Sequence, residues 1–237
     1  MTNTGVRGYS DTVSAIRPTL ATRLAGPAPE RLPRHPHRLS REDVARSQRG
    51  RILRAVAESV AAKGYADTSV ADVIARAGVS RSTFYELYDG KESAFLDAYA
   101  GIQLVHRHLL ESFREGETPV EMVRSAVRSH LAGLAAEPAF TWMFFVEAVA
   151  AGPRILARRR EATESFLDVL TTMVELAMQR DPAVPAPDRA LLLAFVGAVR
   201  ELVATHLLTD SAQSLPGLED AVVAIAQRLL LAPPTAD

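Results

Sequence analysis

The apolar residues within residues 68–91 repeat with the spacing of an α-helix, stop at a glycine and then resume. The first run occupies positions i, i+3, i+4 and i+7, which share one helix face: Val70, Val73, Ile74 and Ala77. Gly78 follows this run where a helix commonly ends, because glycine tolerates a positive φ. Ser80 can then cap a second helix through its hydroxyl group. The pattern predicts two short helices joined by a tight turn, which is the layout of a helix-turn-helix.

Helical spacing also runs through most of the remaining chain. Further helices are predicted over residues 41–63, 91–106, 120–136, 139–150, 153–179, 187–208 and 218–231. Glycine, proline and serine interrupt the pattern between them, at Gly116, Pro138, Gly152-Pro153, 182–187 and 214–217. Since no segment alternates apolar and polar residues as a strand does, the sequence predicts an all-α fold of about nine helices.

The start of the second short helix is the candidate base-reading segment. In a helix-turn-helix these residues meet base edges in the major groove of double-stranded DNA. Arg81, Ser82 and Thr83 occupy this segment, while Val79 and Phe84 can pack back on the first helix. The predicted partner is therefore a DNA operator.

Charge is distributed unevenly along the chain. The 27 Lys/Arg and 28 Asp/Glu residues give a net charge of -1. Residues 1–91 hold 15 basic and 9 acidic residues, a balance of +6, so the remainder holds 12 and 19, or -7. The basic half contains the helix-turn-helix, which suits a phosphate backbone, although a charge block alone is also typical of a solvated surface.

Residues 1–40 show no sustained periodicity and contain five prolines, with six arginines against Asp11 and Glu30. This composition predicts a disordered basic arm that follows DNA phosphates or enters a minor groove. The alternative is a dispensable tail or a start codon assigned too early.

Composition also excludes several kinds of site and classes of protein for this chain. The chain has no cysteine, so disulfides and cysteine-based zinc sites are excluded. No apolar run reaches the roughly 18 residues that span a bilayer, and no apolar secretion signal is present. These observations predict a cytoplasmic protein without a membrane partner.

Residues 51–99 contain five sequence landmarks in order: Gly64-Tyr65, Thr68-Ser69-Val70, Ala77-Gly78-Val79-Ser80, Thr83-Phe84-Tyr85 and Lys91-Glu92. In their order and spacing they resemble the DNA-binding domain of tetracycline-repressor-like (TetR/AcrR) transcription regulators. Two positions depart from that family's pattern. Ile74 stands where a small alanine is common, and Leu87 stands where a polar or aromatic side chain often touches phosphate. The resemblance implies a DNA-binding domain over residues 41–91 and an effector-binding and dimerisation domain over residues 92–237.

Phosphate contacts are expected around the same helices. Arg46 and Arg49 cluster at the start of the helix over residues 41–63, where they would add affinity without reading sequence, unless they belong to a solvated helix end. In the resembled family the helix end that matches Lys91 touches the DNA backbone. The predicted phosphate contacts are Arg46, Arg49, Thr68, Ser69, Ser80, Tyr85 and Lys91.

The densest aromatic cluster lies in residues 140–145 and is followed by Glu147. Such a cluster suits an apolar pocket with one polar group that orients a ligand, and it equally suits ordinary core packing. The resemblance implies an effector site here, and the mostly neutral, aromatic lining favours a hydrophobic small molecule. The predicted pocket residues are Trp142, Phe144, Phe145, Glu147, His106, Phe166, Met173 and Phe195.

The last two predicted helices carry more apolar residues than one buried stripe requires, which indicates a partner surface. The resemblance implies a homodimer whose two heads bind a palindromic operator as a repressor. The alternative is that both helices are central in the core of one subunit. The predicted interface residues are Leu192, Val196, Val199, Val203, Val222, Ile225 and Leu229.

Signals for catalysis are weak. The six histidines show no metal-ligand spacing, and the chain has no glycine-rich phosphate loop or nucleophile elbow. We therefore expect no catalytic residues, no metal and no cofactor.

The residues Arg158, Arg159 and Arg160 stand near Glu161 and Glu164, which indicates a salt-bridged surface or, alternatively, a second nucleic-acid patch. The other functional hypothesis is a helical ligand-binding or protein-interaction module whose head no longer binds DNA.

Overall fold

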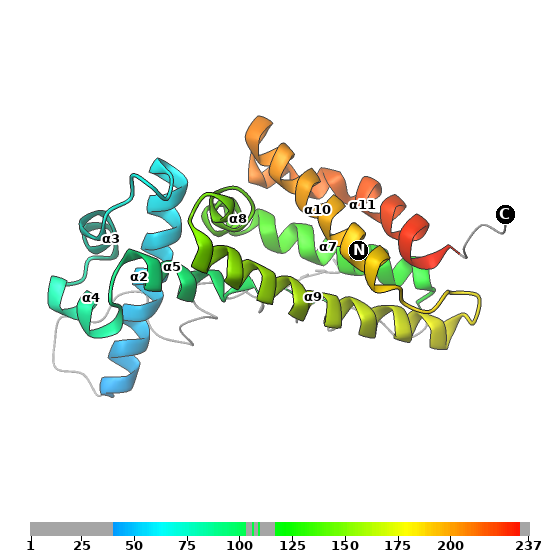
Figure 1. The fold of residues 1–237 in the computed structure, drawn as a ribbon, viewed down its shortest axis with the longest axis horizontal. Coiled ribbons are helices and arrows are strands. Elements are labelled where there is room, and N and C mark those ends of the chain that lie inside the picture. The colour runs from blue at the N-terminus through cyan, green and yellow to red at the C-terminus, as the bar shows by residue number, and fades with distance from the viewer. Residues whose placement is uncertain (1–39, 103–105, 107–108, 110–116, 233–237) are drawn as a thin grey trace, which may run out of the picture.

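The computed structural model describes residues 40–102, 106, 109 and 117–232, so the predicted basic arm lies almost wholly outside the described residues. Within them the chain forms nine α-helices and no strand, which confirms the all-α prediction. Figure 1 shows a head at one end and a longer body at the other, with α8 between them. The helices are α2 (Arg41–Lys63), α3 (Val70–Ala77), α4 (Arg81–Leu87), α5 (Lys91–Tyr99), α7 (Pro119–Ala135), α8 (Pro138–Phe145), α9 (Pro153–Arg180), α10 (Arg189–Thr209) and α11 (Glu219–Ala226). Shorter turns are η2 (Glu147–Val149), η3 (Ala212–Leu218) and η4 (Gln227–Leu231).

Hydroxyl side chains begin several of these helices, because each accepts a hydrogen bond from an otherwise unpaired backbone N–H. Ser40 forms a reciprocal capping box with Asp43 at the start of α2. Thr118 forms the same arrangement with Glu121 at the start of α7. These local pairs explain why the helices begin at these residues.

One predicted helix is shorter than expected. The pattern over residues 91–106 predicts a single helix, but α5 ends at Tyr99 and a turn follows at Ala100 and Gly101. Helical structure resumes at Ile102. The apolar spacing continues across this break, so periodicity alone does not reveal it.

The core of the head is built around α2, which packs against α3, α5 and α8. The side chains of Ile52, Phe84 and Phe95 are fully buried there. This apolar cluster continues into α8 and the start of α9, through Phe140, Met143 and Ile155 among others. The head and the body are therefore joined through a shared core as well as through the chain.

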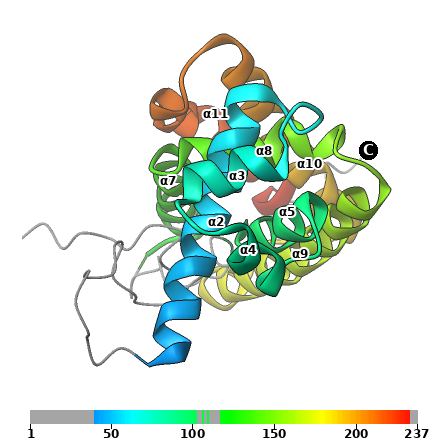
Figure 2. The ribbon, with the colours of Figure 1, turned by 90° about the vertical axis from the view of Figure 1, so that its left-hand side faces the viewer.

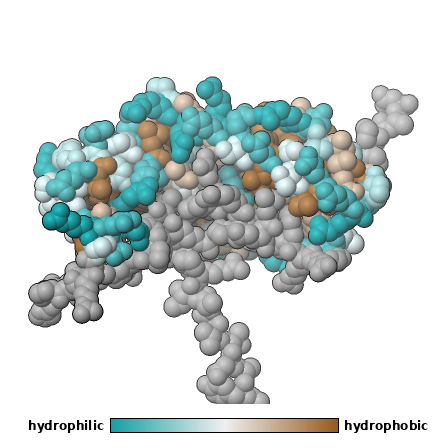
Figure 3. All heavy atoms as spheres, turned by 90° about the horizontal axis from the view of Figure 1, so that it is seen from below, coloured by the Kyte–Doolittle hydropathy of each residue, from teal (hydrophilic) through white to brown (hydrophobic). Residues whose placement is uncertain are grey.

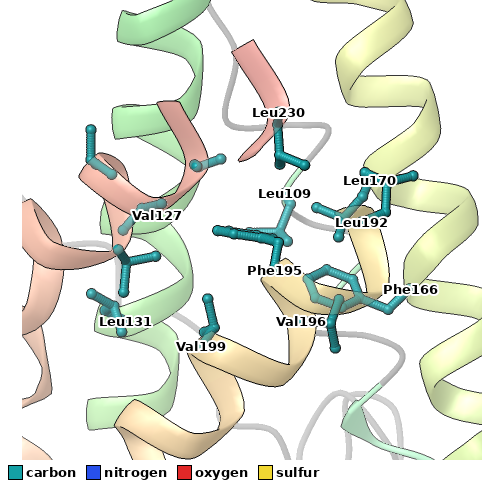
Figure 4. Close-up of a cluster of buried hydrophobic side chains, with 14 of the residues drawn as sticks. Leu109, Val127, Leu131, Phe166, Leu170, Leu192, Phe195, Val196, Val199 and Leu230 are labelled. Atoms are coloured by element: carbon teal, nitrogen blue, oxygen red, sulfur yellow. The ribbon is translucent and has the colours of Figure 1, made fainter. Parts of the chain in front are cut away.

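A second apolar cluster lies among α7, α9, α10 and α11 (Figure 4). Five of the seven residues predicted at a dimer interface are buried in it: Leu192, Val196, Val199, Val203 and Val222. Ile225 and Leu229 are partly buried and pack against the same cluster. For the five buried residues the interface prediction is wrong, because the apolar stripe that indicated a partner is covered by the subunit's own helices.

Helix α10 corrects the expectation that no apolar segment is long enough to span a bilayer. Over its 21 residues it is long and apolar enough to cross a membrane by length and composition, with a mean hydropathy of 1.7 in its most apolar window. Arg200 and Glu201 interrupt the apolar residues of this helix, so the sequence does not show it as one apolar run. One face of the helix packs against α9 and α11.

On the face of the molecule shown in Figure 3, apolar residues form small separate patches among hydrophilic ones. Arg124 and Arg128 of α7 both pair with Glu219 of α11, at 2.9 Å in each case. These surface ion pairs link two helices of the body.

Candidate DNA-binding surface and ligand cavities

The corner between α3 and α4 has the geometry that the sequence predicts. Gly78 adopts the left-handed conformation, with φ 61° and ψ 39°, which ends α3 without the strain that a side chain would cause. Arg51 of α2 adds support, since its Nη1 donates to the carbonyl oxygens of Ala77 and Gly78 at 3.2 Å. The orientation of α4 relative to α3 is therefore held by a glycine and by a side chain from the central helix.

The three candidate base-reading residues lie on the outer side of α4. Figure 2 shows α3 and α4 at the near end of the head, away from the body. Arg81 and Ser82 are exposed, and Thr83 is half-buried. The hydroxyl group of Ser80 lies 2.8 Å from those of both Ser82 and Thr83. The guanidinium group of Arg81 lies 5.4 Å from the ring centroid of Tyr85, so these side chains form one polar surface.

Leu87, which departs from the family pattern, points the other way. It is partly buried and packs against the core of the head. This placement explains why an apolar residue is tolerated there and removes it from the candidate DNA contacts.

Two of the predicted phosphate contacts hold the head together instead. Arg49 donates two hydrogen bonds to Asp97 of α5, from Nε at 2.8 Å and from Nη2 at 2.5 Å. The hydrogen bond to Asp97 raises the pKa of Arg49 well above its usual value. Thr68 is 2% exposed, and its hydroxyl group donates to the carbonyl oxygen of Gly64. In this conformation neither side chain is free to meet phosphate, which corrects the prediction for both.

The remaining predicted phosphate contacts differ in how they are engaged. Ser69 is exposed and caps α3, while Tyr85 is 45% exposed. Among the described residues Arg46 pairs with Glu42 and Asp43 on its own helix, and such surface pairs are weak enough to exchange for a phosphate. Lys91 is held more firmly within the head, because its Nζ donates to the carbonyl oxygen of Tyr65 at 2.6 Å and lies over the Tyr65 ring.

Glu147 and Trp142 lie at the contact between body and head, not in a cavity. Glu147 Oε2 accepts a hydrogen bond from the backbone N–H of Tyr65 at 2.8 Å, and its Oε1 accepts from Trp142 Nε1 at 3.3 Å. The prediction that Glu147 orients a ligand is therefore wrong for this structure. Its carboxylate instead connects the end of α8 to the loop between α2 and α3.

The body contains a large apolar cavity among α7, α9, α10 and α11. It encloses about 720 Å³ of empty space, part of it open to solvent, and His130 is the single polar side chain among the described lining residues. The predicted pocket residues Phe166, Met173 and Phe195 line it. In Figure 4 Phe166 and Phe195 lie opposite Val127 and Leu131 of α7.

A second, polar cavity of about 470 Å³ lies closer to the head. The predicted residues His106, Phe144 and Phe145 line it, and it shares His130, Phe166 and Val199 with the apolar cavity. Six of the eight predicted pocket residues thus line one cavity or the other.

The histidines of the polar cavity are buried, and no carboxylate stands among the described residues that line it. The rings of His106 and Phe166 stack at 3.9 Å between centroids. Burial lowers the pKa of His130 to about 4, and burial together with the charges of His130 and Arg200 lowers the pKa of His106. Both rings are therefore neutral near pH 7.

Four polar residues at or beside the polar cavity were not predicted from the sequence as part of a ligand site: His130, Arg159, Thr163 and Arg200. Thr163 and Arg200 line it directly, and Arg159 lies one turn before Thr163 on α9. Arg159 was expected on a solvated surface. Its spacing of i, i+4, i+7 and i+11 with Thr163, Phe166 and Leu170 places it on the buried face of α9, and this spacing could have identified it.

Among the described residues, no group of three or more His, Cys, Asp or Glu side chains could hold a metal ion. The functional features that the described structure presents are an exposed polar surface on α4 and two connected cavities in the body.

Comparisons with known proteins bear on this arrangement of a helix-turn-helix head and a helical body. Residues 52–98 match the model of the family described as bacterial regulatory proteins, tetR family. The chain thus carries the head of a TetR-family regulator, which confirms the resemblance drawn from the sequence. A search among curated proteins finds no match.

Solved structures with the same fold extend the comparison to the body. The fatty acid degradation regulator FadR from Bacillus halodurans has a TM-score of 0.68 at 18% identity, covering 75% of this chain and 93% of that one. The regulator FadR from Bacillus subtilis, solved in complex with stearoyl-CoA, has a TM-score of 0.65 at 20% identity, covering 74% and 95%. A TetR-family regulator from Marinobacter aquaeolei has a TM-score of 0.60 at 21% identity, covering 82% and 100%. At these identities the likeness establishes a common fold.

Proposed function

We propose that this chain is a cytoplasmic repressor that binds a palindromic operator as a homodimer and leaves it when a hydrophobic effector enters the body. The observation that carries this proposal is the shared core of head and body. Phe144 of α8 is buried in the core that contains Phe84 and Phe95, and it also lines the polar cavity. A ligand that moves α8 must therefore act on the head.

In the proposed complex, α4 lies in the major groove with Arg81, Ser82 and Thr83 against base edges. Phosphate contacts come from the exposed polar groups that border it, which are Ser69, Ser80 and Tyr85, with Arg46 from α2. Lys91 takes part only if it leaves the Tyr65 carbonyl. A second head on a two-fold axis would read the other half of the operator.

The proposed dimer face is the outer side of α10, which replaces the buried residues predicted from the sequence. Leu193 and Leu208 are 51% and 65% exposed. Ala194 and Gly197, on the same side, are also exposed and small enough for two helices to approach closely. Exposed leucines bordered by small residues on one helix face favour contact with a second copy.

For the effector, we propose a molecule with a long aliphatic chain. The apolar cavity offers such a chain an almost uninterrupted apolar lining. The stearoyl-CoA complex of the Bacillus subtilis FadR supports this class of ligand, because that protein has the same fold.

The coupling between effector and operator would pass through the loop between α2 and α3. This loop receives Glu147 from the body, at the Tyr65 N–H, and Lys91 from α5, at the Tyr65 carbonyl. A ligand that prefers one position of α8 changes the position of the loop, and hence the spacing of the two heads. By linkage, operator DNA must weaken ligand binding by the same factor.

An electrophoretic shift assay with the DNA upstream of the protein's own gene tests the proposal. We expect a retarded complex that weakens as salt rises, because phosphate contacts release counterions. Addition of stearoyl-CoA should release the DNA. If no salt-sensitive complex forms, the alternative of a ligand-binding module without DNA binding is favoured, which the exposed carboxylates of Glu86 and Asp89 beside α4 would then explain.

A further inference from the structure

The polar cavity contains cationic and neutral donor groups but no carboxylate among the described residues that line it. Its polar lining consists of Tyr99, His106, His130, Thr163 and Arg200. Arg200 comes from α10, and Thr163 from α9. The charge balance of the cavity is therefore positive.

Arg200 and its neighbour Arg159 lack a described counter-ion. Arg200 Nη2 donates to Thr163 Oγ1 at 2.8 Å, and Thr163 in turn donates to the backbone carbonyl of Arg159. No ion pair joins either guanidinium to a carboxylate among the described residues, although Arg158 next in sequence pairs with Glu161. Burial, and then the charge of Arg159, lower the pKa of Arg200. Two partly buried like charges at close range destabilise one another unless an anion joins them.

Several polar nitrogen atoms at this place are buried without a hydrogen-bond partner among the residues that the structure describes. These atoms are Arg159 Nε, His106 Nδ1 and His130 Nδ1. His106 is 9% exposed and His130 is 8% exposed, so bulk water does not solvate them freely. An unpaired buried polar group is costly, and its partner is commonly a ligand or an ordered water. An ordered water molecule would pair with these nitrogen atoms, but it would bring no negative charge to Arg159 and Arg200.

The polar cavity opens into the apolar one, since His130, Phe166 and Val199 line both. A single ligand can thus place a charged head beside Arg200 and an aliphatic tail along α7 and α10. A ligand that is apolar throughout would leave the arginines without an acceptor, and a small anion would leave the apolar cavity empty.

We propose that the two cavities bind a long-chain aliphatic acid as the free carboxylate, which accepts hydrogen bonds from the remaining N–H groups of Arg200 while Arg159 offsets its charge. The tail fills the apolar cavity beyond Phe166 and Val199. The effector role of this ligand rests on the proposed function, but its binding does not require DNA.

Binding of stearate and of octadecan-1-ol to the delipidated full chain, measured by isothermal titration calorimetry, tests the proposal. The two ligands share one tail and differ in the charge of the head. We expect stearate to bind at least about tenfold more tightly, because charge-assisted hydrogen bonds replace neutral ones. Equal affinities for the two ligands would overturn the proposal.

Substitution of the arginine sharpens the test. Arg200→Met keeps an unbranched apolar stem but removes the guanidinium group, and it should remove the preference for stearate while octadecan-1-ol still binds, which also shows that the variant is folded. Arg158→Met is the matched control, since Arg158 pairs with Glu161 and does not line the cavity. Wild-type stearate binding by Arg200→Met would count against the assignment.

Two further results separate this inference from the proposed function. Stearate that binds through Arg200 but leaves the DNA complex intact supports the site and contradicts its role as the effector site. If stearoyl-CoA binds and releases DNA while stearate does not bind, the regulator stands and the carboxylate site is wrong.

Discussion

The head and the body of this chain are built from the same kind of helix but differ in how completely they fill their interiors. In the head, Ile52, Phe84 and Phe95 are fully enclosed, and Arg49 is paired with Asp97. In the body, Phe195 borders empty space and Arg200 lacks a described carboxylate partner. The difference indicates that the close packing of the head holds the surface of α4 in a fixed geometry, whereas the body leaves unfilled space in its interior.

The largest expected effect tests the contrast in packing. Phe84→Ala should lower the free energy of unfolding by about 3–5 kcal/mol, because it leaves a cavity in a closely packed core. Phe195→Ala should cost roughly half as much, since that ring already faces empty space and loses fewer contacts. Urea unfolding of both variants measures the two values. Equal losses would show that the body is packed as closely as the head.

A pH titration tests the buried imidazoles of the body. The pKa of His130 is about 4 in the folded chain, so between pH 6.5 and 4 the unfolded chain binds more protons. The free energy of unfolding should therefore fall as the pH falls through this window, by on the order of 3 kcal/mol for His130. His106 adds to the fall in the same direction, and Arg200 faces both rings in the same cavity.

His130→Gln removes one titrating group and should flatten the dependence measured by urea unfolding between pH 7 and 4.5. The carboxyl group of Asp97 contributes only at the acidic end of this window. Burial raises its pKa, but hydrogen bonds from Arg49 and Tyr88 outweigh burial and leave the pKa below 3.8. An unchanged slope in His130→Gln would mean that this ring is not buried as the structure shows.

On the head, Thr83→Ala should reduce discrimination between operator and random DNA by about 1–3 kcal/mol, and Arg81→Ala should act alike. Tyr85→Phe is the contrasting variant, because loss of a phosphate contact weakens binding to all sequences equally. Competition binding with operator and random duplexes measures both effects. Unchanged discrimination in Thr83→Ala would show that this side chain does not read a base.

The smallest expected effect concerns the contact between the two regions. Glu147→Gln keeps the shape of the side chain but removes the charge of the carboxylate. The Tyr65 N–H and Trp142 Nε1 donate hydrogen bonds to this carboxylate. We expect the coupling free energy between effector and DNA to fall by about 1 kcal/mol. It is obtained from DNA affinity with and without effector. Glu175→Gln, an exposed substitution on α9, should leave the coupling unchanged.

The head was largely predictable because its determinants are local. Gly78 ends α3 and Ser80 begins α4 within a few residues of one another, so the chain itself carries the turn geometry. The apolar face of α3 and the exposed start of α4 follow from helical spacing. Arg49 was misassigned because its partner, Asp97, is 48 residues away.

The helices of the body could be predicted from the sequence, but which face of each helix is buried could not. A helix such as α10 carries apolar residues on more than one side, and periodicity does not say which side meets a neighbour. Val199 and Val203 therefore fit a dimer interface as well as a core until α7, α9 and α11 are placed around them. Glu147 illustrates the same limit, since its acceptor role depends on a loop 82 residues earlier.

The sequence by itself determined the helices, the corner at Gly78 and the segment that faces outward from it, because capping, glycine conformation and helical spacing act over a few residues. The tertiary structure alone decided which apolar faces are buried, where Glu147 joins head to body, and that Arg159 and Arg200 meet beside buried histidines. These features arise from contacts between segments far apart in the chain, and no local pattern records them.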